Sequence, residues 1–410
     1  MTMLTVTPPP TGRDLGPVFL PLTKDGRIGD DRALAALEER LPLATDCFVF
    51  CPGWLYDRAE AHAEAARFFS LLDGALAPLG GRVRPLRVGL HWPSKPFADE
   101  PPESPEPAAD VTRSPAGPGW PELLRGLDPA SLTRGRLRQL LLTMAEAEIP
   151  RGPEEELELD RLLRSLRAPT VRGGLPISPA HALSFWIMKR RAGEVGERLG
   201  REHLGPLLAR LPEGGPRLHL IGHSFGAKAL TSAVLAGLAP RSLTLLLAAF
   251  SAFAFAEEVP GTDRPGHYRP LLSERRVSGP IVVLHSAHDR ALGSIYPAVT
   301  GAGQLDRAPN PGRLGHVREV VAASALGFAG ARGVLAPQFD LLEVQRTGLP
   351  RQPVINVNAS KVVRDSQWLL GAHRDIYHPE IATLVLMAAG QLEGSPEGPR
   401  RPPLSPWSEP

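Results

Sequence analysis

The sequence predicts an α/β protein with a doubly wound, mostly parallel β-sheet. Short apolar runs that suit buried strands alternate along the chain with longer runs of helical periodicity. The clearest pairs are a strand over 217–221 with a helix over 227–235, a strand over 45–51 with a helix over 58–76, and a strand over 353–358 with a helix over 379–389. Such alternation is typical of parallel sheets whose two faces are both covered by helices.

The turn between the strand over 217–221 and its helix contains the pentapeptide Gly222-His223-Ser224-Phe225-Gly226. A serine at a sharp strand-to-helix turn takes a strained backbone conformation, which only small residues two positions before and after it tolerate. There the hydroxyl of Ser224 would lie above the sheet edge at a helix N-terminus, where unpaired N–H groups favour developing negative charge. We therefore predict that Ser224 is a nucleophile; the alternative is an ordinary tight turn with a buried serine.

This pentapeptide and its flanks resemble the nucleophile elbow of the α/β-hydrolase superfamily, which implies the chain order serine, acid, histidine. The segments Trp92-Pro93-Ser94-Lys95 and Gly371-Ala372-His373-Arg374-Asp375-Ile376 resemble segments of a group of poorly characterised bacterial α/β-hydrolases. In that group the second of these segments carries the catalytic histidine. The similar segments extend over residues 45–95 and 180–392. The resemblance therefore implies the α/β-hydrolase fold and a serine hydrolase.

The acid is predicted at Asp289. A glycine-proline breaker opens a buried strand over 279–286, and Asp289 lies in the loop just past its carboxyl end. Because catalytic groups of open parallel sheets gather outside the carboxyl ends of the strands, Asp289 and Ser224 are expected at the same edge. There Asp289 would accept the Nδ1 proton of the catalytic histidine. The alternative is a loop aspartate that caps a turn.

The histidine is expected between the last strand and the last helix, where the chain has His373 and His378. His373 is the first choice, because it lies in the segment that resembles the catalytic segment of the bacterial group. His378 is the alternative. It stands directly before Pro379, where it can lie at the N-cap of the final helix without a part in the chemistry.

An acyl-transfer enzyme also needs two donors for the tetrahedral oxyanion. The backbone N–H of Phe225, directly after the nucleophile, is predicted as the first donor. The backbone N–H of Trp54, in the turn after the strand over 45–51, is predicted as the second. Related hydrolases often have His-Gly at this turn, whereas this chain has Pro52-Gly53, which keeps the backbone donor.

With these residues in place, the predicted reaction is cleavage of a carboxylic ester, thioester or amide through an acyl-enzyme, without metal or cofactor. The expected partner is a small-molecule, ester-type substrate. Trp92 and Phe253 are candidates for the wall of its pocket, with core packing as the alternative for both. A second class of function is a non-catalytic protein of the hydrolase fold that binds or scaffolds.

The chain divides into a core and an insertion. Residues 1–95 and 176–392 are predicted to form the two parts of the α/β-hydrolase core, and residues 393–410 a disordered tail. Residues 96–175 combine a stretch rich in Pro, Glu and Ser with runs of helical periodicity. They indicate an inserted helical lid over the site, and the alternative is an insertion packed elsewhere.

Composition agrees with one elaborated cytoplasmic domain. The 410 residues are 42% hydrophobic, and the net charge of +2 comes from scattered residues of both signs, which argues against nucleic-acid binding. The two cysteines, Cys47 and Cys51, are expected as free buried thiols. No secretory signal is expected. The longest apolar run, 243–256, is shorter than the roughly 20 residues of a membrane span and predicts a central strand followed by a loop.

Overall fold

The computed structural model describes residues 15–95, 132–145, 162–163, 166, 179–211, 214–260, 264–300, 324–365 and 370–392. These residues form one sheet of eight strands in the order β1-β3-β2-β4-β5-β6-β8-β7. Every registered pairing between neighbouring strands is parallel. The predicted α/β class and mostly parallel sheet are confirmed. Most of the predicted lid and the whole predicted tail lie outside the described residues.

The predicted strands form the middle of the sheet. They are β2 (Asp46–Cys51), β4 (Arg217–His223), β5 (Ser242–Leu246), β6 (Ile281–His285) and β8 (Val354–Asn358), with β3 (Pro85–His91) before Trp92. These strands are almost entirely buried, as is usual when helices cover both faces. The edge strands β1 (Pro17–Pro21) and β7 (Gln338–Asp340) were not predicted: β1 begins and ends with a proline, which argues against a strand, and the three residues of β7 are too few for a periodic pattern.

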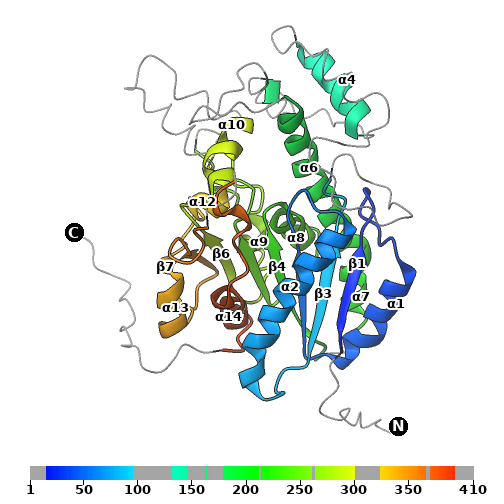
Figure 1. The fold of residues 1–410 in the computed structure, drawn as a ribbon, viewed down its shortest axis with the longest axis vertical. Coiled ribbons are helices and arrows are strands. Elements are labelled where there is room, and N and C mark those ends of the chain that lie inside the picture. The colour runs from blue at the N-terminus through cyan, green and yellow to red at the C-terminus, as the bar shows by residue number, and fades with distance from the viewer. Residues whose placement is uncertain are drawn as a thin grey trace, which may run out of the picture.

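Helices cover both faces of the sheet. Figure 1 shows α2 (Arg58–Leu76) and α14 (Pro379–Ala388) in front of the strands and α8 (Phe225–Leu235) behind them. On the front face α2 and α14 pack against each other. Behind the sheet, α6 (Pro179–Arg198) packs along α8 and forms an outer layer. The helix that follows the Ser224 turn is thus enclosed between the sheet and α6.

The start of α2 is the predicted one, and it is fixed by side chains. Asp57 accepts a hydrogen bond from the Glu60 amide at 2.9 Å, and Glu60 accepts one from the Asp57 amide at 2.8 Å. This reciprocal capping box satisfies two amides that the helix itself leaves unpaired. Lys95 Nζ lies 2.8 Å from Asp57 and 2.7 Å from Glu60, and so ties the segment after β3 to the same cap.

The other helices and helical turns follow in chain order. They are α1 (Asp31–Arg40), η1 (Leu41–Leu43), η2 (Ala77–Leu79), α4 (Arg134–Ala145), η3 (Leu199–Leu204), α7 (Gly205–Ala209), α9 (Pro270–Ser273), η4 (Ala291–Ile295), α10 (Tyr296–Val299), α12 (Leu326–Ala329), α13 (Leu341–Thr347) and η6 (Ala372–Arg374). Of these, α4 belongs to the predicted insertion and packs against α6.

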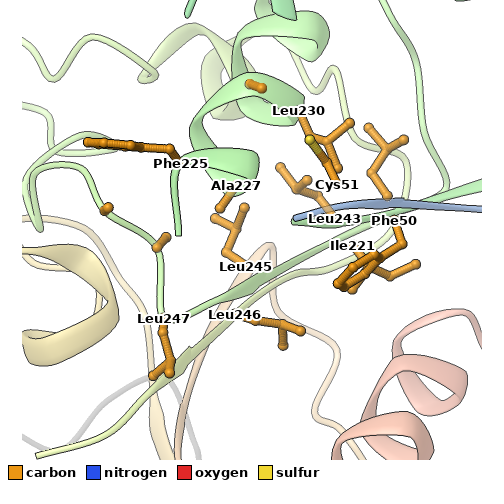
Figure 2. Packing of buried hydrophobic residues seen from close by; sticks show 14 of the residues in the cluster. Phe50, Cys51, Ile221, Phe225, Ala227, Leu230, Leu243, Leu245, Leu246 and Leu247 are labelled. Carbon is orange, nitrogen blue, oxygen red and sulfur yellow. The ribbon is translucent and has the colours of Figure 1, made fainter. Parts of the chain in front are cut away.

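The apolar core lies on both sides of the sheet. Figure 2 shows Leu245 of β5 on the side of Ala227 in α8 and Leu246 on the opposite side, and both leucines are fully buried. Burying one such side chain contributes roughly 1.5–3 kcal/mol. Cys47 and Cys51 are buried free thiols, as expected, and burial raises the pKa of Cys47 to about 12.

A buried polar network closes the amino end of the sheet. His219 Nε2 lies 3.0 Å from Asp46 Oδ1, and His219 Nδ1 lies 2.8 Å from Ser242 Oγ. All three residues are at most 1% exposed, and Arg217 pairs with the Asp46 carboxylate at 3.0 Å. Burial lowers the pKa of His219, which favours its neutral form. These are the residue types of the predicted triad, but substrate has no access to them, so we assign them to fold stability.

The contact between α6 and α8 gives a stability prediction. A Cβ at Gly196 of α6 would lie 1.9 Å from the carbonyl oxygen of Ala229. We expect Gly196→Ala to lower the free energy of unfolding by about 1–3 kcal/mol, because overpacking outweighs the gain in helix propensity. Gly193→Ala on the same helix is the control, since its Cβ would make ordinary van der Waals contacts, at 3.5 Å with the flexible Lys228 side chain and at 3.8 Å with Ser232 Oγ. Urea unfolding with equal midpoints for the two variants would contradict this packing.

Candidate active site

Ser224 lies at the turn from β4 into α8 with a strained backbone. Its φ is 54° and its ψ is −119°, a conformation that costs a residue other than glycine roughly 1–3 kcal/mol. Two backbone hydrogen bonds hold it: the Ser224 amide donates to the Leu246 carbonyl at 3.0 Å, and the Ala249 amide donates to the Ser224 carbonyl at 3.2 Å. The end of β5 and the loop after it therefore keep the turn in place.

The two glycines of the pentapeptide allow close approaches of the backbone. A Cβ at Gly222 would lie 2.4 Å from the Cα of Ala227, in the first turn of α8. A Cβ at Gly226 would lie 2.2 Å from the carbonyl oxygen of Cys51, at the end of β2. Any larger residue would push the helix or the neighbouring strand away. The sequence-based reason for the glycines, that the sharp turn needs room, thus agrees with these contacts.

Ser224, His373 and Asp289 form a continuous chain of hydrogen bonds. His373 Nε2 lies 2.8 Å from Ser224 Oγ, and His373 Nδ1 lies 2.7 Å from Asp289 Oδ2. Because Nδ1 faces a carboxylate it carries the proton, which leaves the Nε2 lone pair to accept the Ser224 hydroxyl. Asp289 is fully buried, and its Oδ1 accepts the Leu292 amide at 2.9 Å. Both oxygens of the carboxylate are therefore bonded.

Main-chain contacts hold the acid loop and the histidine loop together. Asp289 and Gly371 form an antiparallel bridge, and the Ala372 amide donates to the His288 carbonyl at 3.1 Å. Gly371 has a φ of 65°, and a Cβ there would lie 2.6 Å from the His288 carbonyl oxygen. Glycine is needed at this position both for its conformation and for the close approach. This explains why a glycine stands two residues before His373.

His378, the alternative histidine, lies elsewhere. It is the N-cap residue of α14, and its Nε2 lies 2.7 Å from Asp375 Oδ1. The structure thus brings His373, and not His378, against Ser224.

The two predicted oxyanion donors lie in the segments next to Ser224. Phe225 is the first residue of α8, so its amide has no partner inside that helix, and Trp54 follows β2 in the turn after Pro52-Gly53. Neither amide has a hydrogen-bond partner among the residues that the structure describes. A Cβ at Gly53 would lie 2.9 Å from Ser224 Cβ, so the turn after β2 lies directly against Ser224.

The segment after β3 supports that turn. Trp92, a candidate for the pocket wall, is 1% exposed, and its Nε1 donates to the Pro52 carbonyl at 3.0 Å. Ser94 Oγ accepts the Tyr56 amide at 3.0 Å and donates to the Tyr56 carbonyl at 2.9 Å. The indole of Trp92 thus contacts the turn that carries Trp54. The sequence resemblance pointed to the segment of residues 92–95. Its contacts with residues 52–56 could not be predicted, because the two segments are about 40 residues apart in the chain.

Phe253, the other candidate for the pocket wall, packs in a small apolar cluster with Ala252 and Ala256. Rings from two other segments gather around Phe225 and Trp54. Phe185 of α6 lies 5.0 Å from Phe225 and 6.0 Å from Trp54 between ring centroids, and 5.7 Å from Tyr296 of α10. Sequence reasoning did not connect Phe185 with Phe225 and Trp54, or Tyr296 with Phe185, because these residues belong to segments far from the pentapeptide.

His223, directly before Ser224, also makes a contact that the sequence did not indicate. Its Nε2 donates to the carbonyl oxygen of His373 at 2.8 Å, and the two rings lie 5.1 Å apart between centroids. The residue is 2% exposed. Burial, with a smaller contribution from the charge of His373, lowers the pKa of His223 to about 3. His223 is therefore neutral near pH 7.

Comparisons with protein-family models, with curated proteins and with solved structures find no match to this chain. Within the described ranges, no three or more His, Cys, Asp or Glu residues are grouped where they could hold a metal ion. No helix in the same ranges has the length and apolar character needed to cross a membrane.

The state of His223 can be measured by NMR titration of the imidazole groups. Its folded pKa of about 3 lies below the ordinary value of 6.5, so its resonances should not titrate between pH 5 and 8. The unfolded chain binds this proton more readily, so His223 should lower the free energy of unfolding as the pH falls from about 6.5 towards 3. A titration midpoint near the ordinary value would contradict the burial described here.

Proposed function

We propose that the chain is a serine hydrolase of the α/β-hydrolase type that cleaves a carboxylic ester, thioester or amide. The chain of hydrogen bonds from Asp289 through His373 to Ser224, at 2.7 and 2.8 Å, carries the proposal. The three residues follow β6, β8 and β4, so they gather at the carboxyl edge of one parallel sheet, where catalytic groups of such folds lie. Their order along the chain, serine, acid and histidine, also supports it.

In the first half of the reaction Ser224 Oγ attacks the substrate carbonyl carbon, and its proton passes to His373 Nε2. Asp289 stabilises the imidazolium that forms. The carbonyl oxygen becomes an oxyanion, which the amides of Phe225 and Trp54 can bind. When the tetrahedral intermediate collapses, His373 gives the proton to the leaving alkoxide, thiolate or amine, and the acyl group stays on Ser224.

In the second half a water molecule takes the place of the leaving group. His373 Nε2 removes one proton from the water as its oxygen attacks the acyl carbon. When the second tetrahedral intermediate collapses, the bond between the acyl carbon and Ser224 Oγ breaks, and His373 returns the proton to the serine oxygen. The products are a carboxylic acid and the alcohol, thiol or amine. Every step uses side chains and amides of this chain.

The strain at Ser224 favours catalysis over a purely scaffolding role. A φ of 54° at a serine costs roughly 1–3 kcal/mol, and two glycines and two backbone hydrogen bonds maintain it. Strain of this kind clusters at functional sites, where the surrounding structure holds the strained conformation in place. A binding module would gain nothing from aligning this serine with a histidine and a buried carboxylate.

A fluorophosphonate probe tests the proposal. The wild-type chain should be labelled covalently, and Ser224→Ala should abolish labelling because no hydroxyl is left to attack phosphorus. Asp289→Asn should slow labelling on the order of 10³–10⁴-fold, since the amide cannot hold the tautomer of His373 that accepts the serine proton. The rates are measured by gel fluorescence against time.

The two histidines provide a matched control. His373→Gln should lose labelling, whereas His378→Gln should keep it, because His378 pairs with Asp375 and not with Ser224. Circular dichroism and thermal unfolding establish that each variant is folded. A folded wild-type chain that no fluorophosphonate labels would overturn the proposal.

A further inference from the structure

The distance between His373 Nε2 and Ser224 Oγ depends on the position of the backbone of residue 373. Asp289 fixes the rotation of the ring through Nδ1, but it does not by itself fix the main chain that carries the ring. That main chain is the short helical turn η6, which has a single turn of three residues. A turn so short has few hydrogen bonds of its own, so an external contact has a large effect on its position.

His223 supplies such a contact from a rigid element. It is the last residue of β4, a buried central strand, and it immediately precedes Ser224. Its Nε2 donates to the carbonyl oxygen of His373 at 2.8 Å. One peptide bond therefore separates the nucleophile from the side chain that holds the base. Ser224 and the side chain that holds the backbone of His373 are therefore both attached to the end of β4. This common attachment fixes the distance between Ser224 Oγ and His373 Nε2.

Burial and the turn after β2 restrict the imidazole ring of His223. It is 2% exposed, and a Cβ at Gly53 would lie 3.3 Å from its Nδ1, so the turn with the proposed oxyanion donor closes the other side. Besides burial, the charges of His373 and Arg374 lower the pKa of His223. A neutral ring with its proton on Nε2 is the state that donates to a carbonyl. It also adds no positive charge beside the imidazolium that forms on His373.

We propose, on the basis of the serine hydrolase function, that His223 is a positioning residue that holds the backbone of His373 and so sets its Nε2 against Ser224. It touches neither the substrate nor the transferred proton. Its effect belongs to the chemical step, because that step needs the Ser224 hydroxyl and the His373 lone pair aligned. Substrate binding before that step does not need this alignment.

The test uses steady-state hydrolysis of p-nitrophenyl acetate by the full chain and three substitutions at position 223. His223→Leu removes the donor, and we expect kcat to fall on the order of 10–100-fold while KM changes less than about threefold. His223→Gln can place its amide nitrogen near the position of Nε2, and we expect it to keep kcat within about threefold of the wild type. His223→Asn is polar but too short to reach, so it should lose kcat as His223→Leu does.

A matched control lies on the same strand. His219 is another buried histidine of β4, at the far end from the site, and His219→Gln should lower the melting temperature without changing kcat of the folded enzyme. If His223→Leu does not fold, the comparison of His223→Gln with His223→Asn decides the outcome.

The results separate this inference from the function on which it rests. A wild-type chain that neither hydrolyses the ester nor reacts with a fluorophosphonate counts against the hydrolase. An active wild type with unchanged kcat in His223→Leu or His223→Asn overturns the positioning role. The same holds if folded His223→Gln loses as much kcat as His223→Asn, because then the shape of the ring matters and its hydrogen bond does not.

Discussion

The strained backbone of Ser224 is the constraint on which the rest of the site depends. A φ of 54° places the hydroxyl above the sheet only if β4, α8, β2 and β5 approach one another closely enough to hold the turn. Gly222 and Gly226 permit these approaches, and the bonds to Leu246 and Ala249 secure them. The dense packing of the central strands is therefore as much a part of the site as the proposed triad itself.

Contacts between distant segments complete the arrangement. Trp92 and Ser94, after β3, support the turn that carries the amide of Trp54. Gly371 joins the histidine loop to the acid loop, while His223 joins it to β4. Each loop of the site is thus bonded to a rigid strand or to a second loop. This agrees with the requirement that catalytic groups be held in place before the substrate arrives.

The sequence predicted those features that local chain chemistry determines. The strand, glycine turn and helix around Ser224 and the start of the helix at residue 58 are encoded within a few residues, and the structure has both. The bond from His223 to the His373 carbonyl and the position of Phe185 could not be predicted, because they join segments some 40 to 150 residues apart whose register only the folded sheet defines. Trp92 and Phe253 show the same limit: their apolar character was clear, but their neighbours were not.

The most direct measurement of the central claim is the intact mass of the chain during turnover of an activated ester such as p-nitrophenyl acetate. We expect an acetyl adduct of about 42 Da that rises within the first turnover, maps to the peptide containing Ser224, and decays as acetate is released. The adduct should be absent from Ser224→Ala. Ester hydrolysis by the wild type without any adduct at Ser224, or with the same adduct in Ser224→Ala, would contradict the central claim.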